Sequence, residues 1–256
     1  MKLCECFSRW RIKRRLKHYA IPDDLWEATL QALPFLRHWS AERLLTLRDM
    51  TVLFLCEKSI IGAKGFRVQP FHRVVVATQA CVPVLNLGLA YYDDFQTVVL
   101  YPGEFIVDND WEDENGIVHQ DCEPLMGEAI EGGPVVLSWL DAIDPGRSAE
   151  TTDANPPINV VIHEFAHKID MRGGDAGSAP SLPRSIAPER WQETMRNAYQ
   201  DFCMRVESGE EVAIDPYAAE NPAEFFAVFS ETFFVAPEIL EREYPEVFAL
   251  LKIFYG

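Results

Sequence analysis

The stretch VVIHEFAHKID at residues 160–170 constrains this chain more than any other feature. It sets His163 and His167 four residues apart, with Glu164 directly after the first histidine. Each residue of an α-helix turns by about 100°, so on a helix both imidazoles lie on one face, within reach of a single ion. Burying two histidines and a glutamate on so apolar a helix without a metal would be costly. The stretch therefore predicts a helix that carries a zinc site.

The chemistry of such a site follows from its ligands. Imidazole nitrogens bind zinc well, and two of them plus one carboxylate leave the fourth tetrahedral position open, as in catalytic sites. Glu164 would project beside that position without binding the ion. Its carboxylate can take a proton from the attacking water and later pass it to the leaving amine. We therefore expect a peptidase with Glu164 as general base, because a purely structural zinc site has no use for one.

The third ligand is not part of this stretch. A metzincin would place glycine and histidine where Asp170 and Gly173 stand, so that subclass is excluded. Two carboxylates remain as candidates. Glu189 follows His167 by 22 residues, close to the short spacing of thermolysin-like enzymes, and Glu224 follows it by 57 residues in a more apolar segment. The spacing alone leaves both open.

Glu224 also has a purely structural interpretation. It ends the run Asn221-Pro222-Ala223-Glu224, which is typical of a capping box in which the glutamate bonds back to the backbone. The sequence that follows, FFAVFSETFF, is that of a buried helix, where an inward carboxylate needs a cation. Glu231 lies seven residues on, on the same face, and is a candidate for an alternative ligand or for a residue that orients one.

The remaining elements follow from periodicity and turn residues. Helical patterns are expected at 23–33, at 41–58 after an N-cap at Ser40, from an N-cap at Asn155 with Pro156 as first residue to Arg172, and at 186–207, 221–235 and 238–254. Segments rich in β-branched and aromatic residues predict strands within 71–89, 95–107 and 132–143. The order of helices, strands and then helices predicts an α+β fold with a small mixed sheet. We expect an N-terminal helical segment over 1–60 and the metal-binding domain over 61–256.

The net charge of the chain limits the kinds of partner that it can be expected to bind. The formal net charge is −17, which argues against general nucleic-acid binding because a polyanion would be repelled. Residues 1–18 nevertheless carry a net charge of +6, which leaves −23 on the rest. This basic arm could serve an acidic partner, but we favour a first helix whose cations face the acidic body of the protein itself.

Targeting signals and cysteine usage indicate a cytoplasmic protein. No apolar segment follows the N-terminal charges, so no secretory signal is expected. The longest apolar stretch, 74–90, is broken by polar residues and by Pro83, so it is not a membrane span. The six cysteines include no C-x-x-C pair, which is typical of reduced thiols.

Three blocks together carry a specific resemblance. They are NVVIHEFAHKIDMRGG at 159–174, GGPVVLSWLDA at 132–142 and YAAENPAEFFAVFSETFF at 217–234. Together they resemble the Mlc titration factor A family of zinc peptidases, which the chain matches in order over about residues 60–256. The catalytic domain of anthrax lethal factor is similar at a greater distance. The resemblance implies a zincin-like fold with one Zn²⁺ per chain.

The resemblance also assigns residues. In both families the third ligand is the glutamate that opens the second helix, which is Glu224 here. The lethal-factor pattern places a catalytic tyrosine seven residues before it, at Tyr217, whose hydroxyl can donate to the carbonyl oxygen as that oxygen gains charge. The acidic residue expected four positions after the ligand is replaced by Val228. Asp170, three residues past His167, is a candidate for orienting an imidazole N–H.

The resemblance implies a function with two sides. One is aminopeptidase-type activity on short peptides, with residues 133–139 as the edge strand that pairs with the substrate, or else as a core strand. The other is the binding of a regulatory partner, the glucose-regulated repressor Mlc, which family members bind. The alternative to a working peptidase is therefore a repressor-binding protein whose peptidase activity is incidental.

Overall fold

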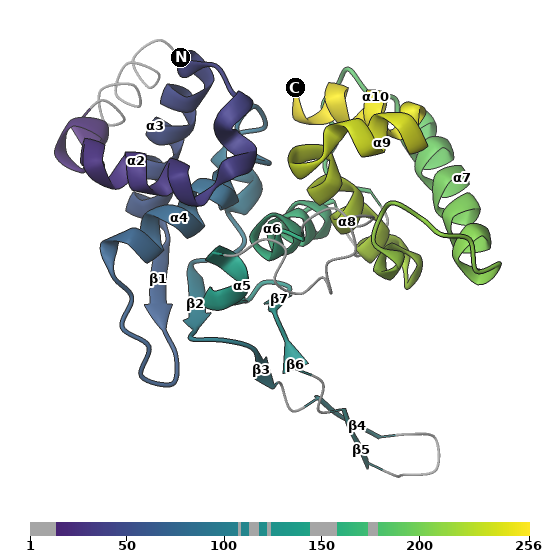
Figure 1. The fold of residues 1–256 in the computed structure, drawn as a ribbon, viewed down its shortest axis with the longest axis horizontal. Coiled ribbons are helices and arrows are strands. Elements are labelled where there is room, and N and C mark those ends of the chain that lie inside the picture. The colour runs from purple at the N-terminus through teal and green to yellow at the C-terminus, as the bar shows by residue number, and fades with distance from the viewer. Residues whose placement is uncertain (1–13, 107–108, 113–117, 122–123, 144–157, 174–178) are drawn as a thin grey trace.

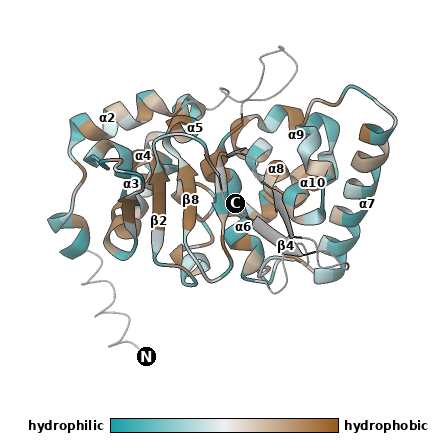
Figure 2. Ribbon diagram, turned by 90° about the horizontal axis from the view of Figure 1, so that it is seen from below, coloured by the Kyte–Doolittle hydropathy of each residue, from teal (hydrophilic) through white to brown (hydrophobic). Residues whose placement is uncertain are grey.

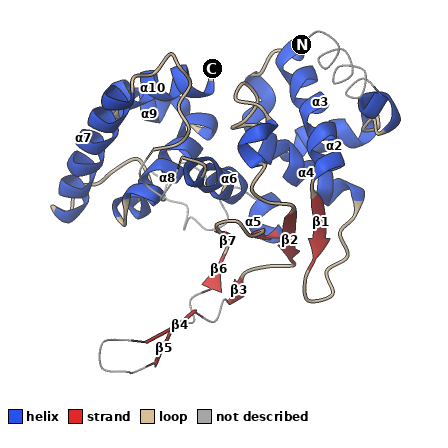
Figure 3. Cartoon of the chain, turned by 180° about the vertical axis from the view of Figure 1, so that it is seen from behind, coloured by secondary structure: helices blue, strands red, loops and turns tan. Residues whose placement is uncertain are grey.

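The computed structural model of the chain describes residues 14–106, 109–112, 118–121, 124–143, 158–173 and 179–256. Its helices form an N-terminal and a C-terminal group, with the motif helix between them and a small sheet beside the N-terminal group (Figures 1 and 3). The fold is α+β, as the order of the elements predicted. Within the described part of the chain, no helix combines the length and the apolar character needed to span a membrane.

The N-terminal helices are confirmed. They are α2 (Asp23–Ala32), the 3₁₀ helix η1 (Pro34–His38) and α3 (Ala41–Glu57). Ser40 caps α3 as expected, because its hydroxyl accepts a hydrogen bond from the Arg43 amide at 3.2 Å. Of the basic arm, residues 1–13 lie outside the described residues. Arg15, just beyond them, pairs with Glu57 of α3 at 2.8 Å, in line with cations that face the protein itself.

The sheet has four strands in the order β1 (Ser59–Gly62), β2 (Thr97–Tyr101), β8 (Val135–Ser138) and β7 (Gly127–Ala129). The first three are parallel, and β7 runs antiparallel to β8. The mixed sheet is therefore confirmed, but β8 lies inside it between β2 and β7, and β2 and β8 are both largely hydrophobic (Figure 2). The expectation of an edge strand at 133–139 is wrong, since that edge belongs to β7.

Two short antiparallel ladders extend from the body below the sheet (Figure 1). They pair β3 (Phe105–Ile106) with β6 (Pro124–Leu125), and β4 (Asn109–Glu112) with β5 (Val118–Asp121).

The strand predicted within 71–89 is instead the helix α4 (Pro70–Cys81), followed by turns and the 3₁₀ helix η2 (Leu89–Tyr92). Gln69 and His72 form a capping box at its start, with the Gln69 amide donating to His72 Nδ1 at 3.1 Å. The β-branched run that suggested a strand, Val74–Val76, is almost completely buried. Tertiary burial has therefore overridden a weak local preference.

Two other predicted boundaries differ. Only residues 135–138 of the segment 132–143 are strand, residues 132–134 belong to the turn before it, and the last five residues fold as α5 (Trp139–Ile143). The helix predicted over 238–254 is two helices, α9 (Pro237–Glu243) and α10 (Pro245–Tyr255). Pro245 explains the break, because proline lacks an amide donor and disfavours helical geometry in the residue before it.

The C-terminal half holds the functional elements. These are α6 (Val160–Met171), α7 (Pro188–Glu207), the 3₁₀ helix η3 (Pro216–Ala219) and α8 (Pro222–Val235). The N-cap of α6 is Asn159, whose side chain accepts from the Ile162 amide at 3.0 Å, and not Asn155, which lies outside the described residues.

The motif helix is central to the core. Phe165 of α6 makes edge contacts with Phe54 of α3 and Tyr92 of η2, with ring centroids 5.8 Å and 5.0 Å apart. All three rings are fully buried. Helix α6 thus packs against elements of the N-terminal half, and it also packs against α8 of the C-terminal half.

Candidate metal centre

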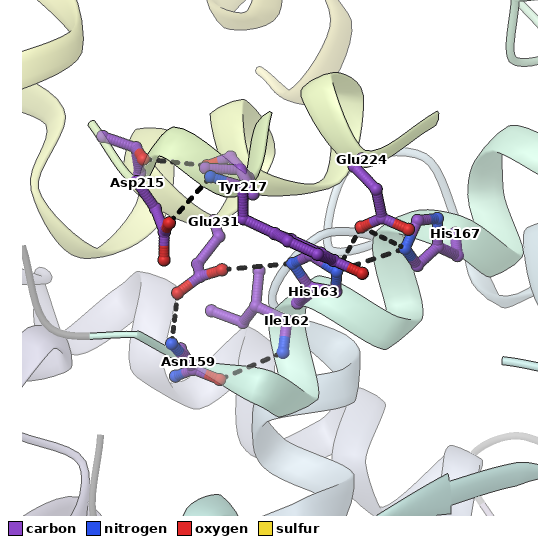
Figure 4. Close-up of polar contacts among 10 residues, drawn as sticks. Asn159, Ile162, His163, His167, Asp215, Tyr217, Glu224 and Glu231 are labelled. Carbon is purple, nitrogen blue, oxygen red and sulfur yellow. Dashed lines mark hydrogen bonds and ion pairs between the residues drawn. The ribbon is translucent and has the colours of Figure 1, made fainter. Parts of the chain in front are cut away.

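The structure brings together the two motif histidines and Glu224. His163 Nε2 lies 3.0 Å from Glu224 Oε2, His167 Nε2 lies 3.3 Å from the same oxygen, and the two Nε2 atoms are 3.2 Å apart (Figure 4). The histidines come from α6 and the glutamate from the first turn of α8. Their side chains are 11–16 % exposed, so the cluster lies in a nearly closed but accessible position.

This spacing fits a small tetrahedral ion. Zinc bonds of about 2.0–2.1 Å at tetrahedral angles place neighbouring ligand atoms about 3.3–3.4 Å apart. The three separations are close to that value, and two imidazoles with one carboxylate form a donor set that zinc accepts. Among the described residues this is the group of three that could hold a metal ion.

Glu224 uses its carboxylate for this cluster and not for the helix end. Asn221 alone caps α8, since its side-chain oxygen accepts from the amides of Ala223 and Glu224 at 2.9 Å and 3.0 Å. Burial raises the pKa of Glu224, but hydrogen bonds to His163 and His167 outweigh burial and lower that pKa to about 2. The capping-box interpretation of Glu224 is therefore wrong.

The rival candidate, Glu189, lies elsewhere. It is exposed in the first turn of α7 and takes no part in the cluster. The structure thus brings Glu224, and not Glu189, to the two histidines.

A buried polar network orients His163 from behind. Glu231 Oε2 lies 3.4 Å from His163 Nδ1, and Glu231 Oε1 accepts the Asn159 amide (Figure 4). Asn159 Nδ2 in turn donates to Gln79 Oε1 of α4 at 2.9 Å, and Gln79 Nε2 donates to the Ala142 carbonyl at 3.0 Å. A carboxylate at Nδ1 favours the tautomer that leaves Nε2 free for a metal.

Glu231 thus contacts His163 through Nδ1, and it is not part of the three-residue cluster. Burial lowers the pKa of His163, but its hydrogen bonds with Glu224 and Glu231 outweigh burial and hold that pKa well above its usual value. Asp170 is buried at the end of α6, beside a cavity of about 300 Å³. That it orients an imidazole stays a prediction.

Glu164 lies beneath the edge strand. It is only 6 % exposed, and burial raises its pKa although His163 and His167 oppose that effect. Gly127 of β7 lies directly against it: a Cβ atom at Gly127 would come 2.5 Å from Glu164 Oε1. The predicted general base is thus close to both the cluster and the free edge of the sheet.

Tyr217 stands on η3, in front of His163. Its ring centroid is 6.3 Å from that of His163, and its hydroxyl end points toward the cluster (Figure 4). The side chain is half exposed. Burial and the negative charge of Glu224 raise the pKa of Tyr217 to about 12, so its hydroxyl keeps its proton. The position suits a hydrogen-bond donor at the mouth of the site.

A family model described as glucose-regulated metallo-peptidase M90 matches residues 7–256. The chain belongs to the M90 family. Its relatives include proteins named Mlc titration factor A from Klebsiella pneumoniae, 39% identical over 234 residues, and from Cronobacter sakazakii, 38% identical over 233. These alignments cover 90% of this chain and 84% and 85% of the relatives. A relative of the same name from Escherichia coli is 36% identical over 250 residues, or 96% of this chain and 89% of its own.

Membership of the M90 family implies a metallopeptidase, and so a metal ion. Three residues near this site were not predicted from the sequence: Gln79, Asn159 and Gly127. Asn159 could have been found, since an asparagine directly precedes the apolar run of the motif. The other two come from segments distant in sequence, so no local pattern points to them.

Proposed function

We propose that this M90 chain is a zinc-dependent peptidase of aminopeptidase type that acts on short peptides. His163, His167 and Glu224 would hold the ion in a zincin-like arrangement with glutamate as third ligand. The observation that supports this most is the spacing of their three ligand atoms, 3.0–3.3 Å, in a nearly closed position. The aminopeptidase type, the division of the chain at residue 60 and a cytoplasmic location rest on the sequence alone.

Each residue would have a distinct part in hydrolysis. A zinc ion held there supplies a Lewis acid that polarises the scissile carbonyl and lowers the pKa of water. The Glu164 carboxylate accepts a proton from the attacking water and donates it to the leaving amine nitrogen. The Tyr217 hydroxyl donates a hydrogen bond to the carbonyl oxygen as negative charge develops there.

Strand β7 would position the peptide. The Ser138 amide bonds the Met126 carbonyl at 2.8 Å, and the Ile130 amide bonds the Pro134 carbonyl at 3.2 Å. Because antiparallel strands alternate, the backbone groups of Gly127 and Ala129 then point to the outer side of the edge. No strand of the described chain pairs with that side. An extended peptide could add there as a further strand, above Glu164.

The decisive experiment compares wild type with Glu164→Gln after metal analysis. Wild type should contain zinc and hydrolyse aminoacyl and short-peptide reporters, and a chelator should abolish the activity. Glu164→Gln should keep the zinc and lose a factor of at least about 10²–10⁴ in turnover, the usual contribution of general-base catalysis. Glu189→Gln, exposed on α7, is the matched control and should stay active. Near-normal turnover in zinc-replete Glu164→Gln would exclude this role.

A second function is favoured by the names of the relatives. They are called Mlc titration factor A, a name that says of those proteins that they titrate Mlc. We propose that this chain can bind a similar repressor through a surface separate from the metal centre. In that case peptidase activity would be incidental to its regulatory effect.

A further inference from the structure

Lys168 directly follows His167, and its side chain is fully buried. Its Nζ lies 2.7 Å from Asp94 Oδ2 and donates to the carbonyl oxygens of Ile130 at 2.9 Å and Gly133 at 3.4 Å. An ammonium group has three donors, so each has an oxygen partner. Such a buried charge is tolerated only when it is paired in this way. The cation is thus fixed to the oxygen atoms around it.

Two of those oxygens belong to the turn that joins β7 to β8. The turn closes on itself, because the Gly133 amide donates to the Ile130 carbonyl at 2.9 Å. The same Ile130 carbonyl accepts from Lys168. Lys168 therefore fastens the hairpin of the edge strand to helix α6, through backbone oxygens and without any side chain of the hairpin.

The other end of β7 meets α6 at Gly127. A Cβ atom there would lie 2.5 Å from Oε1 and 2.6 Å from Cγ of Glu164. Glu164 is buried, so it has little free space into which it could retreat. Only glycine allows the strand this close to the carboxylate.

We infer that Lys168 and Gly127 are positioning residues that set the distance between edge strand β7 and helix α6. The inference rests on the proposed function, because it concerns a peptide paired with β7 over Glu164. Paired strands lie about 4.7–4.9 Å apart, so the position of β7 fixes the position of the peptide backbone. Reacting atoms must come within about 3–3.5 Å, and a shift of about 1 Å can cost about 10²-fold in rate. Lys168 holds the strand in place, and Gly127 sets how closely Glu164 approaches it.

The chain supplies a matched control for Lys168. Lys58, at the end of α3, is also buried and also donates to carbonyl oxygens, those of Tyr92 and Phe95. These two residues flank Asp94 in the sequence, and neither belongs to the β7–β8 turn. Lys58→Met thus removes a buried ammonium from the same neighbourhood without releasing the edge strand.

Amide hydrogen exchange tests the fastening without any need for catalysis. In Lys168→Met the amide of Ile130, which bonds Pro134 in the hairpin, should exchange about tenfold faster than in wild type, relative to amides of α6. In Lys58→Met this ratio should not change. Wild-type exchange at Ile130 in Lys168→Met would overturn the inference.

Kinetics test the consequence for the substrate. A pentapeptide can pair along β7, whereas a leucyl-p-nitroanilide reporter has one residue and cannot. Lys168→Met should therefore raise KM for the pentapeptide by a factor about ten times larger than the factor for the reporter. A tenfold difference corresponds to the loss of about one hydrogen bond between peptide and strand. Gly127→Ala should instead lower kcat for both substrates by about 10–10²-fold with little change in KM. Zinc content should match wild type in both variants.

Two results would contradict the inference: equal effects of Lys168→Met on both substrates, or wild-type kcat in Gly127→Ala. If zinc-loaded wild type cleaves neither substrate, the proposed function fails on that ground. Hydrogen exchange at Ile130 then still decides whether Lys168 holds the strand.

Discussion

At Glu224 two interactions could compete for one carboxylate, the start of a helix and a pair of imidazoles. The structure separates them, because Asn221 satisfies the first amides of α8 and leaves Glu224 free to reach His163 and His167. Losing a residue that merely orients a zinc ligand costs about 10–100-fold in affinity, so losing a ligand should cost more.

Glu224→Ala should therefore lose its zinc on dialysis, whereas Glu189→Ala should retain a full equivalent. Since the Glu224 side chain takes no part in the helix cap, the variant should still fold, and zinc content measured by mass spectrometry decides. A full equivalent of zinc in Glu224→Ala, with none in Glu189→Ala, would show that the ligand assignment is wrong.

The burial of the Glu164 carboxylate should make the stability of the protein depend on pH. Burial raises its pKa above the ordinary value of 4.5. In the metal-free protein, the folded state then holds this proton at a pH where the unfolded chain has released it. Stability should accordingly fall as pH rises from about 4.5 through the raised pKa, and stay reduced above it.

Glu164→Gln removes the carboxylate and hence this dependence. The metal-free variant should melt at a higher temperature than metal-free wild type near neutral pH, and the difference should vanish below about pH 4. Thermal melts over a pH series measure this. A difference that is the same at both ends of the series would mean that ionisation of Glu164 is not its cause.

At the scale of elements, three helices meet behind the candidate metal centre. Gln79 of α4, Asn159 at the start of α6 and Glu231 of α8 form one buried chain of hydrogen bonds that ends on His163. The residue that begins the motif helix thus also supports His163.

Asn159→Ala should consequently have two effects. It should lower the free energy of unfolding by about 0.5–2 kcal/mol through the lost cap. It should also weaken zinc binding by about 10–100-fold, because Glu231 loses part of its support. Ser40→Ala, which removes the cap of α3 far from the site, should lower stability only. Zinc titrations and chemical unfolding of both variants distinguish the two effects, and unchanged zinc affinity in Asn159→Ala would refute the link.

For the whole molecule, the net charge of −17 suits a partner with a basic face. Charge complementarity of this kind mainly speeds association and is weakened by salt. Repressor binding through the outer surface would need no activated water. Catalysis and binding should then be separable.

A pull-down with a Mlc-type repressor checks this expectation. Wild type and Glu164→Gln should retain the repressor equally, and retention should decrease as salt concentration rises. Loss of binding in the inactive variant alone would mean that both functions share the metal centre.

The features that could be predicted from the sequence are those with local signals. Helices were predicted from the spacing of His163 and His167, from the cap at Ser40 and from the apolar run after Asn221. The order of helices and strands predicted the α+β class. The same patterns could not decide between Glu189 and Glu224. The family resemblance favoured Glu224, and in the structure Glu224 lies beside the two histidines.

Which distant segments meet depends on the packing of the whole fold and could not be predicted from local patterns. Residues 70–81 became a helix because the core buries Val74–Val76 from several sides, a condition that β-propensity does not include. The edge strand is β7 and not residues 133–139, because strand order depends on which strands pair, and the sequence of a single strand does not specify its partners. Glu231, Gln79, Lys168 and Gly127 act through partners far away in sequence. Periodicity tells which face of an element is buried, but the packing of elements determines what that face touches.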